Sequence, residues 1–254
     1  MEILQMEGIT LEFGGLRALD SVDLTINAGQ IFGIIGPNGA GKTTLFNIIT
    51  GIYVPVEGTI SFRGQDMQGV TAYKAAGLGI GRTFQNIRLF NKLSVIDNVR
   101  VGSHAINRSN FISDLLGLPR AWREEKIILA RARQLLEMVG LYSKRHEYAD
   151  NLSYGEQRRL EIARALAMNP ALLLLDEPAA GMNSSEKVEL MDLIYQIREE
   201  FNLTILLVEH DMNLVMQICE RIAVLNYGRI IAEGTPDEIK TNEAVISSYL
   251  GAQA

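Results

Sequence analysis

QIFGII at residues 30–35 runs directly into GPNGAGKT at residues 36–43, and this junction decides the fold. The first segment is a continuous apolar run, which is typical of a strand buried on both faces of a parallel sheet. The second matches the phosphate-binding loop pattern GxxxxGK(S/T). A helix is predicted from Lys42 to Thr50, ended by Gly51. Strand, glycine-rich loop and helix in this order indicate a site for phosphate groups.

The loop residues predict how a nucleotide is held. Glycines let backbone N–H groups approach the phosphates, and the helix N-terminus adds partial positive charge. In this pattern Lys42 reaches the β and γ phosphates, Thr43 holds Mg²⁺ and Thr44 bonds the α phosphate. A guanine-reading NKxD motif is not supported, because NKLS at residues 91–94 lacks the Asp. We therefore expect ATP and Mg²⁺, with the nucleotide held by Gly36, Pro37, Asn38, Gly39, Ala40, Gly41, Lys42, Thr43 and Thr44.

Two further strand ends carry groups suited to hydrolysis. LLLLDEP at residues 172–178 is an apolar strand that ends in two acids. Asp176 is predicted to bind Mg²⁺, and Glu177 to polarise the attacking water, a general-base role worth roughly 10²–10⁴ in rate. ILLVEHDM places His210 just beyond another buried strand. We expect His210 to lie beside Glu177 at the same sheet edge, within reach of the γ phosphate.

The rest of the chain alternates between strand and helix patterns. The opening third has the strand period, with ILQMEG, ITLEF and VDLTI as short strands. Residues 95–140 are predicted to be helical, with an irregular connection at NRSNFISDLLGLPR. The βαβ order after Tyr154 indicates an α/β fold with a parallel sheet covered by helices. The predicted elements are helices over 156–168, 185–200 and 212–219, strands over 171–175, 204–208 and 221–225, and the hairpin NYGRIIAEG.

Composition excludes several classes of protein. The chain has 254 residues, 47% of them hydrophobic and 21% charged, as expected of a globular protein. A formal net charge of -6 predicts no nucleic-acid partner. The single cysteine, Cys219, allows no disulfide framework and favours a reducing compartment and a buried thiol. No segment has the ~18 consecutive apolar residues of a membrane span, so a membrane role requires a partner.

NLSYGEQRRLEIARAL at residues 151–166 is a Ser-x-Gly turn that opens a helix. One helix end contributes only about 0.3–1 kcal/mol to anion binding, so this turn cannot form an independent ATP site. With the motifs above, the chain resembles an ABC transporter ATPase subunit, and LSYGEQ stands where that family carries its LSGGQ signature. The resemblance covers essentially the whole chain. It implies an α/β P-loop NTPase (RecA-like) parallel-sheet core with an antiparallel β subdomain and an inserted α-helical subdomain.

The resemblance implies roles for four more residues. Two such subunits pair head to tail, so that Ser153 and Gly155 of one chain close over the γ phosphate held by the other. Gln85, in RTFQN, matches the Q-loop, which senses Mg²⁺ and the lytic water and couples the site to the membrane subunits. Phe13 matches the aromatic residue that stacks on adenine, and an ordinary strand core residue is an equally good interpretation. The implied partners are a second ATPase subunit (identical or related), integral membrane permease subunits and, indirectly, a solute-binding protein.

Two residues depart from the family pattern. Tyr154 replaces the first glycine of the signature, where the backbone is less free to take φ > 0. Asn183 stands where an Asp is usual, which removes a charge from the dimer seam. The aromatic-bearing signature, EQRRLEIARAL and DEPAAGMN are similar to the ATPase subunits of branched-chain (hydrophobic) amino-acid importers. The competing interpretations are a lipopolysaccharide-export ATPase and a soluble non-transport ABC ATPase.

The resemblance also predicts how the chain is divided and where it sits. Residues 1–84 and 160–254 form the predicted ATP-binding core, and residues 85–159 the inserted helical subdomain. QNIRLFNKL at residues 85–93 is the predicted groove for a coupling helix of the permease, which would hold the chain peripherally at the cytoplasmic face of the inner membrane. The 103–131 segment either contacts the membrane subunit or lipid head groups, or forms a solvated helical extension packed by Trp122. Its candidate contact residues are Arg108, Phe111, Trp122 and Arg123.

Overall fold

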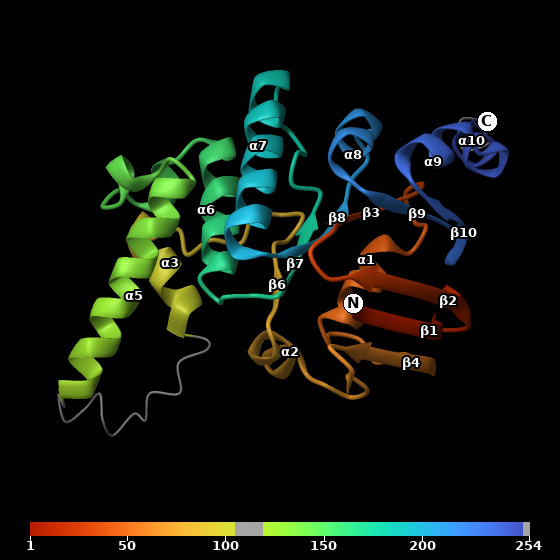
Figure 1. Cartoon of the computed structure of the whole chain (residues 1–254), viewed down its shortest axis with the longest axis horizontal. Helices are drawn as coiled ribbons and strands as arrows, with labels where there is room; N and C mark the ends of the chain where they lie inside the picture. Colours follow the sequence, from red (N-terminus) through yellow and green to blue (C-terminus); the bar gives the residue numbers. More distant parts are fainter. Residues whose placement is uncertain (105–118, 251–254) are drawn as a thin grey trace.

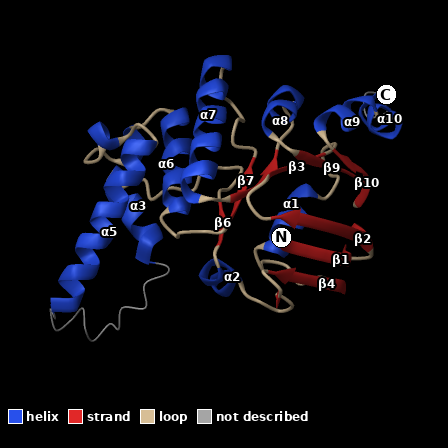
Figure 2. Cartoon of the chain, viewed as in Figure 1, coloured by secondary structure: helices blue, strands red, loops and turns tan. Residues whose placement is uncertain are grey.

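The computed structural model describes residues 1–104 and 119–250 of the chain. Figure 1 shows a central sheet with an antiparallel sheet beside it and the helices α3, α5 and α6 at the opposite end. Coloured by secondary structure, the same view separates a strand-rich side from a helix-rich side (Figure 2).

A six-stranded sheet forms the core of the described residues, in the order β10-β9-β3-β8-β7-β6. Neighbouring strands from β9 to β6 are parallel, and β10 at the edge is antiparallel to β9. β3, β7 and β8 are buried along their whole length, as expected of parallel strands covered on both faces. The strands span Ile31–Ile35 (β3), Ile80–Arg82 (β6), Leu172–Asp176 (β7), Thr204–Val208 (β8), Arg221–Asn226 (β9) and Arg229–Gly234 (β10).

A second, antiparallel sheet has the order β2-β1-β4-β5. Its strands span Glu2–Phe13 (β1), Leu16–Asn27 (β2), Glu57–Phe62 (β4) and Gln65–Asp66 (β5). The prediction of two short strands within residues 2–13 is wrong, because β1 is continuous. Its register with β2 shifts between Met6 and Ile9, and Gly8 takes a φ of 60° there. Gly8 therefore permits a local irregularity inside one strand instead of ending it.

The helices follow the predicted order, with shifted ends. α6 begins at Tyr154 rather than at residue 156, because the Ser153 side chain caps it and Glu156 accepts from the Ser153 N–H. α5 begins at Pro119, and proline is favoured in a first helical turn. The sequence does not predict α10. The helices span Lys42–Ile49 (α1), Ala72–Leu78 (α2), Val95–His104 (α3), Pro119–Met138 (α5), Tyr154–Leu166 (α6), Ser184–Phe201 (α7), Met212–Ile218 (α8), Pro236–Thr241 (α9) and Glu243–Leu250 (α10), with short 3-10 turns at Tyr142–Lys144 and Ala149–Asn151.

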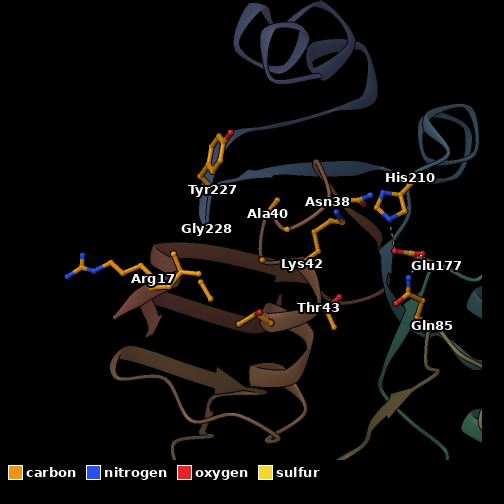
Figure 3. Close-up of a pocket in the computed structure, with 15 residues that line it drawn as sticks. Arg17, Asn38, Ala40, Lys42, Thr43, Gln85, Glu177, His210, Tyr227 and Gly228 are labelled. Carbon is orange, nitrogen blue, oxygen red and sulfur yellow. Dashed lines mark hydrogen bonds and ion pairs between the residues drawn. The ribbon is translucent and has the colours of Figure 1, made fainter. Parts of the chain in front are cut away.

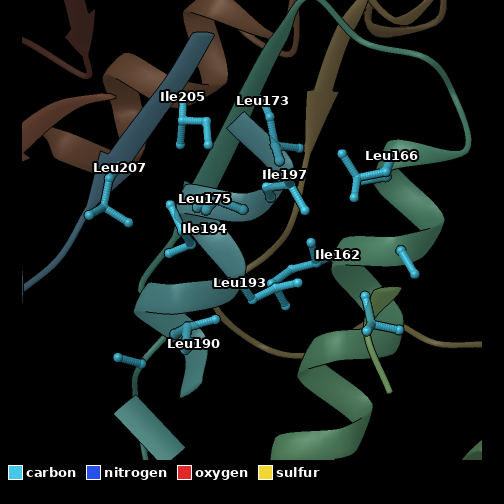
Figure 4. Close-up of a cluster of buried hydrophobic side chains, with 14 of the residues drawn as sticks. Ile162, Leu166, Leu173, Leu175, Leu190, Leu193, Ile194, Ile197, Ile205 and Leu207 are labelled. Atoms are coloured by element: carbon cyan, nitrogen blue, oxygen red, sulfur yellow. The ribbon is translucent and has the colours of Figure 1, made fainter. Parts of the chain in front are cut away.

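Two clusters of buried apolar side chains cover the faces of the core sheet. One contains residues of α1 and of the antiparallel sheet, and the other residues of α6 and α7. Figure 4 shows the second cluster, in which α6 and α7 lie over β7 and β8. Burying one such side chain contributes about 1.5–3 kcal/mol, so each of them stabilises the packing of α6 and α7 on this face of the sheet. The labelled residues, each at most 6% exposed, are Ile162, Leu166, Leu173, Leu175, Leu190, Leu193, Ile194, Ile197, Ile205 and Leu207.

The 103–131 segment is described only at its two ends. Trp122 on α5 is 69% exposed, so it does not pack the extension as one hypothesis expects. Arg108 and Phe111 lie outside the described residues. None of the described helices combines the length and the apolarity required to cross a bilayer. The predicted domain boundary between residues 159 and 160 falls inside α6, and the division into core and inserted subdomain stays a prediction.

Candidate functional site

A cleft of about 500 Å³ opens where the phosphate-binding loop meets α1. Figure 3 shows Lys42 and Asn38 of the loop facing His210, Glu177 and Gln85, which come from three other segments of the chain. The structure therefore brings together most of the residues predicted to bind and hydrolyse ATP. The lining residues are Leu16, Arg17, Ala18, Asn38, Gly39, Ala40, Gly41, Lys42, Thr43, Thr44, Gln85, Glu177, His210, Tyr227 and Gly228.

Close backbone contacts require two glycines of the loop. Gly36 has a φ of 152°, and a Cβ on it would lie 2.0 Å from the carbonyl oxygen of Leu225. Gly41 has a φ of 106°, and its Cβ would lie 2.6 Å from the carbonyl oxygen of Ala18. Neither the conformation nor the space admits a side chain. The loop is thus held from behind by β2 and β9.

Lys42 is a buried cation at the centre of the loop. It is 5% exposed, and its Nζ donates to the carbonyl oxygens of Gly36 at 2.7 Å and Pro37 at 2.9 Å. Burial lowers the pKa of Lys42, and the charges of Glu177 and Asp176 oppose that shift. An ammonium group in this position is a compact charge suited to phosphate oxygens.

Glu177 is held between two side chains at the rim of the core sheet. Its Oε2 accepts from Gln85 Nε2 at 2.9 Å, and its Oε1 lies 2.5 Å from His210 Nε2 (Figure 3). Its backbone has a φ of 47°, although its N–H still donates to the Val208 carbonyl at 2.8 Å. A non-glycine residue in this region costs on the order of 1–3 kcal/mol, and such strain clusters at functional sites. The strained turn points the carboxylate out of β7 and into the cleft.

Asp176, the residue before Glu177, is 2% exposed and is not among the residues that line the cleft. Its Oδ2 lies 3.0 Å from Arg82 Nη2. Burial raises the pKa of Asp176, and the Arg82 charge opposes that shift. This ion pair ties the end of β7 to β6.

The predicted metal ligands are chemically suited to Mg²⁺. Thr43, Gln85 and Asp176 offer hydroxyl, amide and carboxylate oxygens, the hard donors that this ion prefers. Within residues 1–104 and 119–250 no group of three or more His, Cys, Asp and Glu side chains is arranged to hold a metal. Mg²⁺ commonly uses one or two protein ligands together with phosphate oxygens and water, so the donor set fits.

Glu209 is a buried acid that sequence reasoning missed. It is 3% exposed, and its carboxylate accepts from the N–H groups of Ala179 at 2.7 Å and His210 at 3.1 Å. Burial raises the pKa of Glu209, and these N–H donors oppose that shift. The side chain ties the loop after Glu177 to the backbone of His210. The sequence signal that could have identified Glu209 is its position directly before His210.

Several predicted site residues lie outside this cleft. Phe13 is half-exposed and packs edge-on against Tyr53, with ring centroids 5.2 Å apart. Gly36, Pro37 and Asp176 are not among the residues that line the cleft. Ser153 and Gly155 line a separate hollow of about 200 Å³ with Glu156, Arg159, Met182, Glu186, Glu189 and Leu190.

The two departures from the family pattern have local explanations. Tyr154 is the first residue of α6 and does not have a positive φ, so the expected loss of backbone freedom has no effect here. Asn183 caps α7: its Oδ1 accepts from Glu186 N–H at 3.0 Å. Asn and Asp are about equally good caps, so the helix start is preserved without the charge.

Five lining residues were not predicted: Leu16, Arg17, Ala18, Tyr227 and Gly228. The Gly228 N–H donates to the Ala40 carbonyl at 2.9 Å, and its own carbonyl accepts from Asp20 at 2.9 Å. The β9–β10 turn thus joins the loop to β2. This contact spans most of the chain, and the glycine in NYGR was its only local signal.

The chain is similar to known ATP-binding cassettes. A family model described as ABC transporter matches residues 19–180, and one described as branched-chain amino acid ATP-binding cassette transporter matches residues 229–254. The high-affinity branched-chain amino acid transport ATP-binding protein LivG of Escherichia coli (strain K12) is 47% identical over 249 residues, 98% of each chain. The protein BraF of Pseudomonas aeruginosa, of the same description, is 45% identical with the same coverage.

Solved structures agree with this similarity. The ADP conformation of MJ1267, an ATP-binding cassette of an ABC transporter, has a TM-score of 0.86 at 31% identity and covers 99% of each chain. The dimeric cassette MJ0796 bound to ADP and Pi has a TM-score of 0.78 at 28% identity and covers 92% of this chain and 99% of that chain. The predicted fold, with its parallel core sheet and antiparallel β subdomain, is confirmed.

Proposed function

This chain belongs to the ABC transporter family of ATP-binding proteins, and we propose that it is the ATP-hydrolysing subunit of a branched-chain amino-acid importer, working through separate membrane permease subunits. The relatives named for branched-chain transport and the match at residues 229–254 favour this importer over a lipopolysaccharide exporter. The observation that carries the catalytic part is the position of Glu177, between Gln85 and His210 and opposite Lys42.

ATP would place its phosphates against the loop. The N–H groups between Gly39 and Thr44 and the start of α1 converge there and favour negative charge. Lys42 would exchange its bonds to the Gly36 and Pro37 carbonyls for bonds to the β and γ phosphates. Adenine would lie toward β2 and the β9–β10 turn, where Ala18 and Tyr227 line the cleft. Stacking on Phe13 would require its ring to leave Tyr53.

Hydrolysis needs a base beside the γ phosphate. Glu177 takes the proton of the attacking water, a role worth roughly 10²–10⁴ in rate. Gln85 and His210 hold its two oxygens, which fixes the direction of the carboxylate. Thr43, Gln85 and Asp176 are the residues that would hold Mg²⁺, which would supply positive charge at the phosphate oxygens.

The signature turn supports a paired assembly. Ser153 and Gly155 lie in their own hollow, separate from the loop that holds the nucleotide in the same chain. A second ATPase subunit would bring its own Ser153 turn, or the equivalent, over the γ phosphate. The dimeric structure of the cassette MJ0796 supports the pairing of two such chains. The N-terminus of α6 then adds its partial positive charge to the donors of the loop.

The permease would dock on the segment after Gln85. Phe90 is 49% exposed, while its backbone is fixed by two hydrogen bonds to the Asn98 side chain. The Phe90 N–H donates to Asn98 Oδ1 at 2.9 Å, and the Phe90 carbonyl accepts from Asn98 Nδ2 at 3.1 Å. An exposed ring on a fixed backbone is suited to receive an apolar helix. Leu89 is partly buried, so Phe90→Ala is the cleaner variant. It should lower transport and leave ATP binding unchanged. Docking here would place the chain peripherally at the cytoplasmic face of the membrane.

The proposal is tested in membrane vesicles that contain the permease, the solute-binding protein and this chain. Uptake of labelled leucine should require ATP and Mg²⁺, and it should stop when the chain carries Lys42→Ala. The chain should also co-purify with the permease from solubilised membranes. Leucine uptake that continues at the wild-type rate with Lys42→Ala would overturn the proposed function.

A further inference from the structure

A buried ion pair joins α6 to the segment that carries Gln85. Arg158 and Glu161 lie one turn apart on α6, and both side chains are 0% exposed. Arg158 Nη1 is 2.8 Å from Glu161 Oε2. The pair faces residues 84–88, which follow β6 and lead into the segment on which the permease is proposed to dock.

Both members of the pair bind the backbone of that segment. Arg158 donates from Nη1 to the Phe84 carbonyl at 2.6 Å and from Nη2 to the Gln85 carbonyl at 2.8 Å. Glu161 Oε1 accepts from the N–H of Phe84 at 3.4 Å and of Arg88 at 3.2 Å. The ion pair therefore fixes both ends of the segment through main-chain groups, whatever its side chains do.

Stability alone gives little reason for such a pair. Burying two charges carries a large desolvation penalty, and apolar residues of similar volume often pack as well or better. Burial raises the pKa of Glu161, and the charge of Arg158 and the N–H groups of Arg88 and Phe84 oppose that shift. What distinguishes this pair is the backbone segment that it holds in place, residues 84–88.

The segment it holds leads directly to the catalytic acid. The Gln85 carbonyl is bound by Arg158, and the Gln85 side chain binds Glu177 at 2.9 Å. The same helix is capped by Ser153, the residue proposed to meet the partner's nucleotide. One rigid helix thus connects a contact to the partner's site with the side chain that orients Glu177 in its own site.

We propose that Arg158 and Glu161 are positioning residues, an internal clamp by which α6 sets Gln85 against Glu177 and so makes hydrolysis in one site depend on closure of Ser153 on the other. The inference rests on the proposed function. When the partner's nucleotide draws the Ser153 turn inward, α6 moves as a unit. The clamp carries the backbone of Gln85 with it.

The first test measures the clamp without ATP. The paired variant Arg158→Met with Glu161→Leu removes both charges together, so no buried charge is left without its partner. Hydrogen–deuterium exchange of residues 84–88 should become at least about tenfold faster. The matched control is Arg198→Met with Glu220→Leu, since Arg198 also joins a carboxylate (2.9 Å) to a backbone carbonyl, that of Gly29 (2.9 Å). The control should leave exchange at residues 84–88 unchanged, and unchanged exchange in the clamp variant would overturn the proposal.

The second test asks whether the clamp acts through Gln85. In the wild-type background the paired variant should lower kcat for ATP about tenfold and change the Kd for ATP less than about twofold. In a Gln85→Ala background it should lower kcat by less than about twofold, because the group it positions is gone. An equal loss in both backgrounds would show that the pair acts elsewhere and would refute the clamp.

The two tests separate this inference from the proposed function. A wild-type chain that neither binds nor hydrolyses ATP would refute the proposed function, while the exchange experiment would still decide whether the pair holds residues 84–88. A wild-type chain that hydrolyses ATP, with equal loss in both backgrounds, would refute the clamp alone. Partial recovery of kcat by Arg158→Lys, which keeps the charge and donors to the carbonyls, would support it.

Discussion

Replacing Glu177 with Gln tests the proposed base most directly. The substitution keeps the volume of the side chain and one acceptor oxygen. That oxygen can still take the bond from His210 Nε2, at the 2.5 Å position of Oε1. The new amide nitrogen would then face Gln85 Nε2, 2.9 Å away, so the Gln85 amide must turn to present its oxygen. Apart from that turn the site keeps its shape, and it loses the negative charge and the group that accepts a proton.

The expected loss follows from that single change. General-base catalysis contributes roughly 10²–10⁴ in rate, which is about 2.7–5.4 kcal/mol at about 1.36 kcal/mol per tenfold. ATP affinity should not fall, because the lost charge lies at the rim of the sheet and Lys42 and the loop N–H groups are unchanged. Bound ATP that is not hydrolysed should hold two subunits together.

Single-turnover hydrolysis and size-exclusion chromatography measure these two effects. The Glu177→Gln chain should elute as a dimer in ATP and Mg²⁺, with kcat at least about a hundredfold below wild type. Glu220→Gln is the control, because Glu220 is an exposed acid paired with Arg198 at 2.9 Å, away from the cleft. A kcat within about threefold of wild type would remove Glu177 from the role of base.

Three further variants follow from the geometry. Burial raises the pKa of Glu209 above its ordinary 4.5, so the stability that Glu209 contributes is fully present below pH 4.5 and is lost as pH rises through the pKa of the folded state. Glu209→Gln should therefore remove this dependence of the unfolding free energy on pH, as measured by urea unfolding. An unchanged pH dependence would contradict the role given to Glu209. Gly36→Ala should prevent stable folding, because its Cβ would lie 2.0 Å from the Leu225 carbonyl oxygen. Gly39→Ala, with nothing within 4 Å of its Cβ, should cost only about 1–2 kcal/mol by thermal melting. Similar melting of the two variants would refute the argument that the Leu225 contact excludes a side chain at Gly36. Ser153→Ala should lose about 0.5–2 kcal/mol of cap stability and most ATP-driven dimerisation while single-chain ATP binding is kept, and normal dimerisation would exclude the turn from the interface.

The parts of the fold that depend on local sequence patterns were predictable. The strand, loop and helix around residues 30–50 and the βα alternation after Tyr154 depend on neighbouring residues, and both are confirmed. The single strand β1 was not predictable, because Gly8 looks like a turn residue and the sheet around it decides otherwise. The same limit applies to Phe13: its motif position is visible, but its contact with Tyr53 depends on tertiary packing.

The clamp was missed for a different reason. Arg158 and Glu161 are three residues apart on a helix, a spacing at which opposite charges usually form an exposed pair. Only the placement of α6 against β6 and residues 84–88 makes them buried and gives them backbone partners. Sequence spacing identifies which side chains share a helix face, and it does not tell whether that face meets water or another segment.

The surroundings of the acids also explain why Glu177 is suited to be the base. Asp176 is paired with Arg82 at 3.0 Å, and Glu209 is occupied by two backbone N–H groups. These contacts bind both carboxylates inside the protein, and neither side chain lines the cleft. Glu177 contacts an amide and an imidazole instead, is 14% exposed at its side chain, and faces the cleft. Its neighbours therefore orient the carboxylate without occupying it with a fixed cation, and of these three acids Glu177 is the one that lines the cleft and is placed for proton transfer.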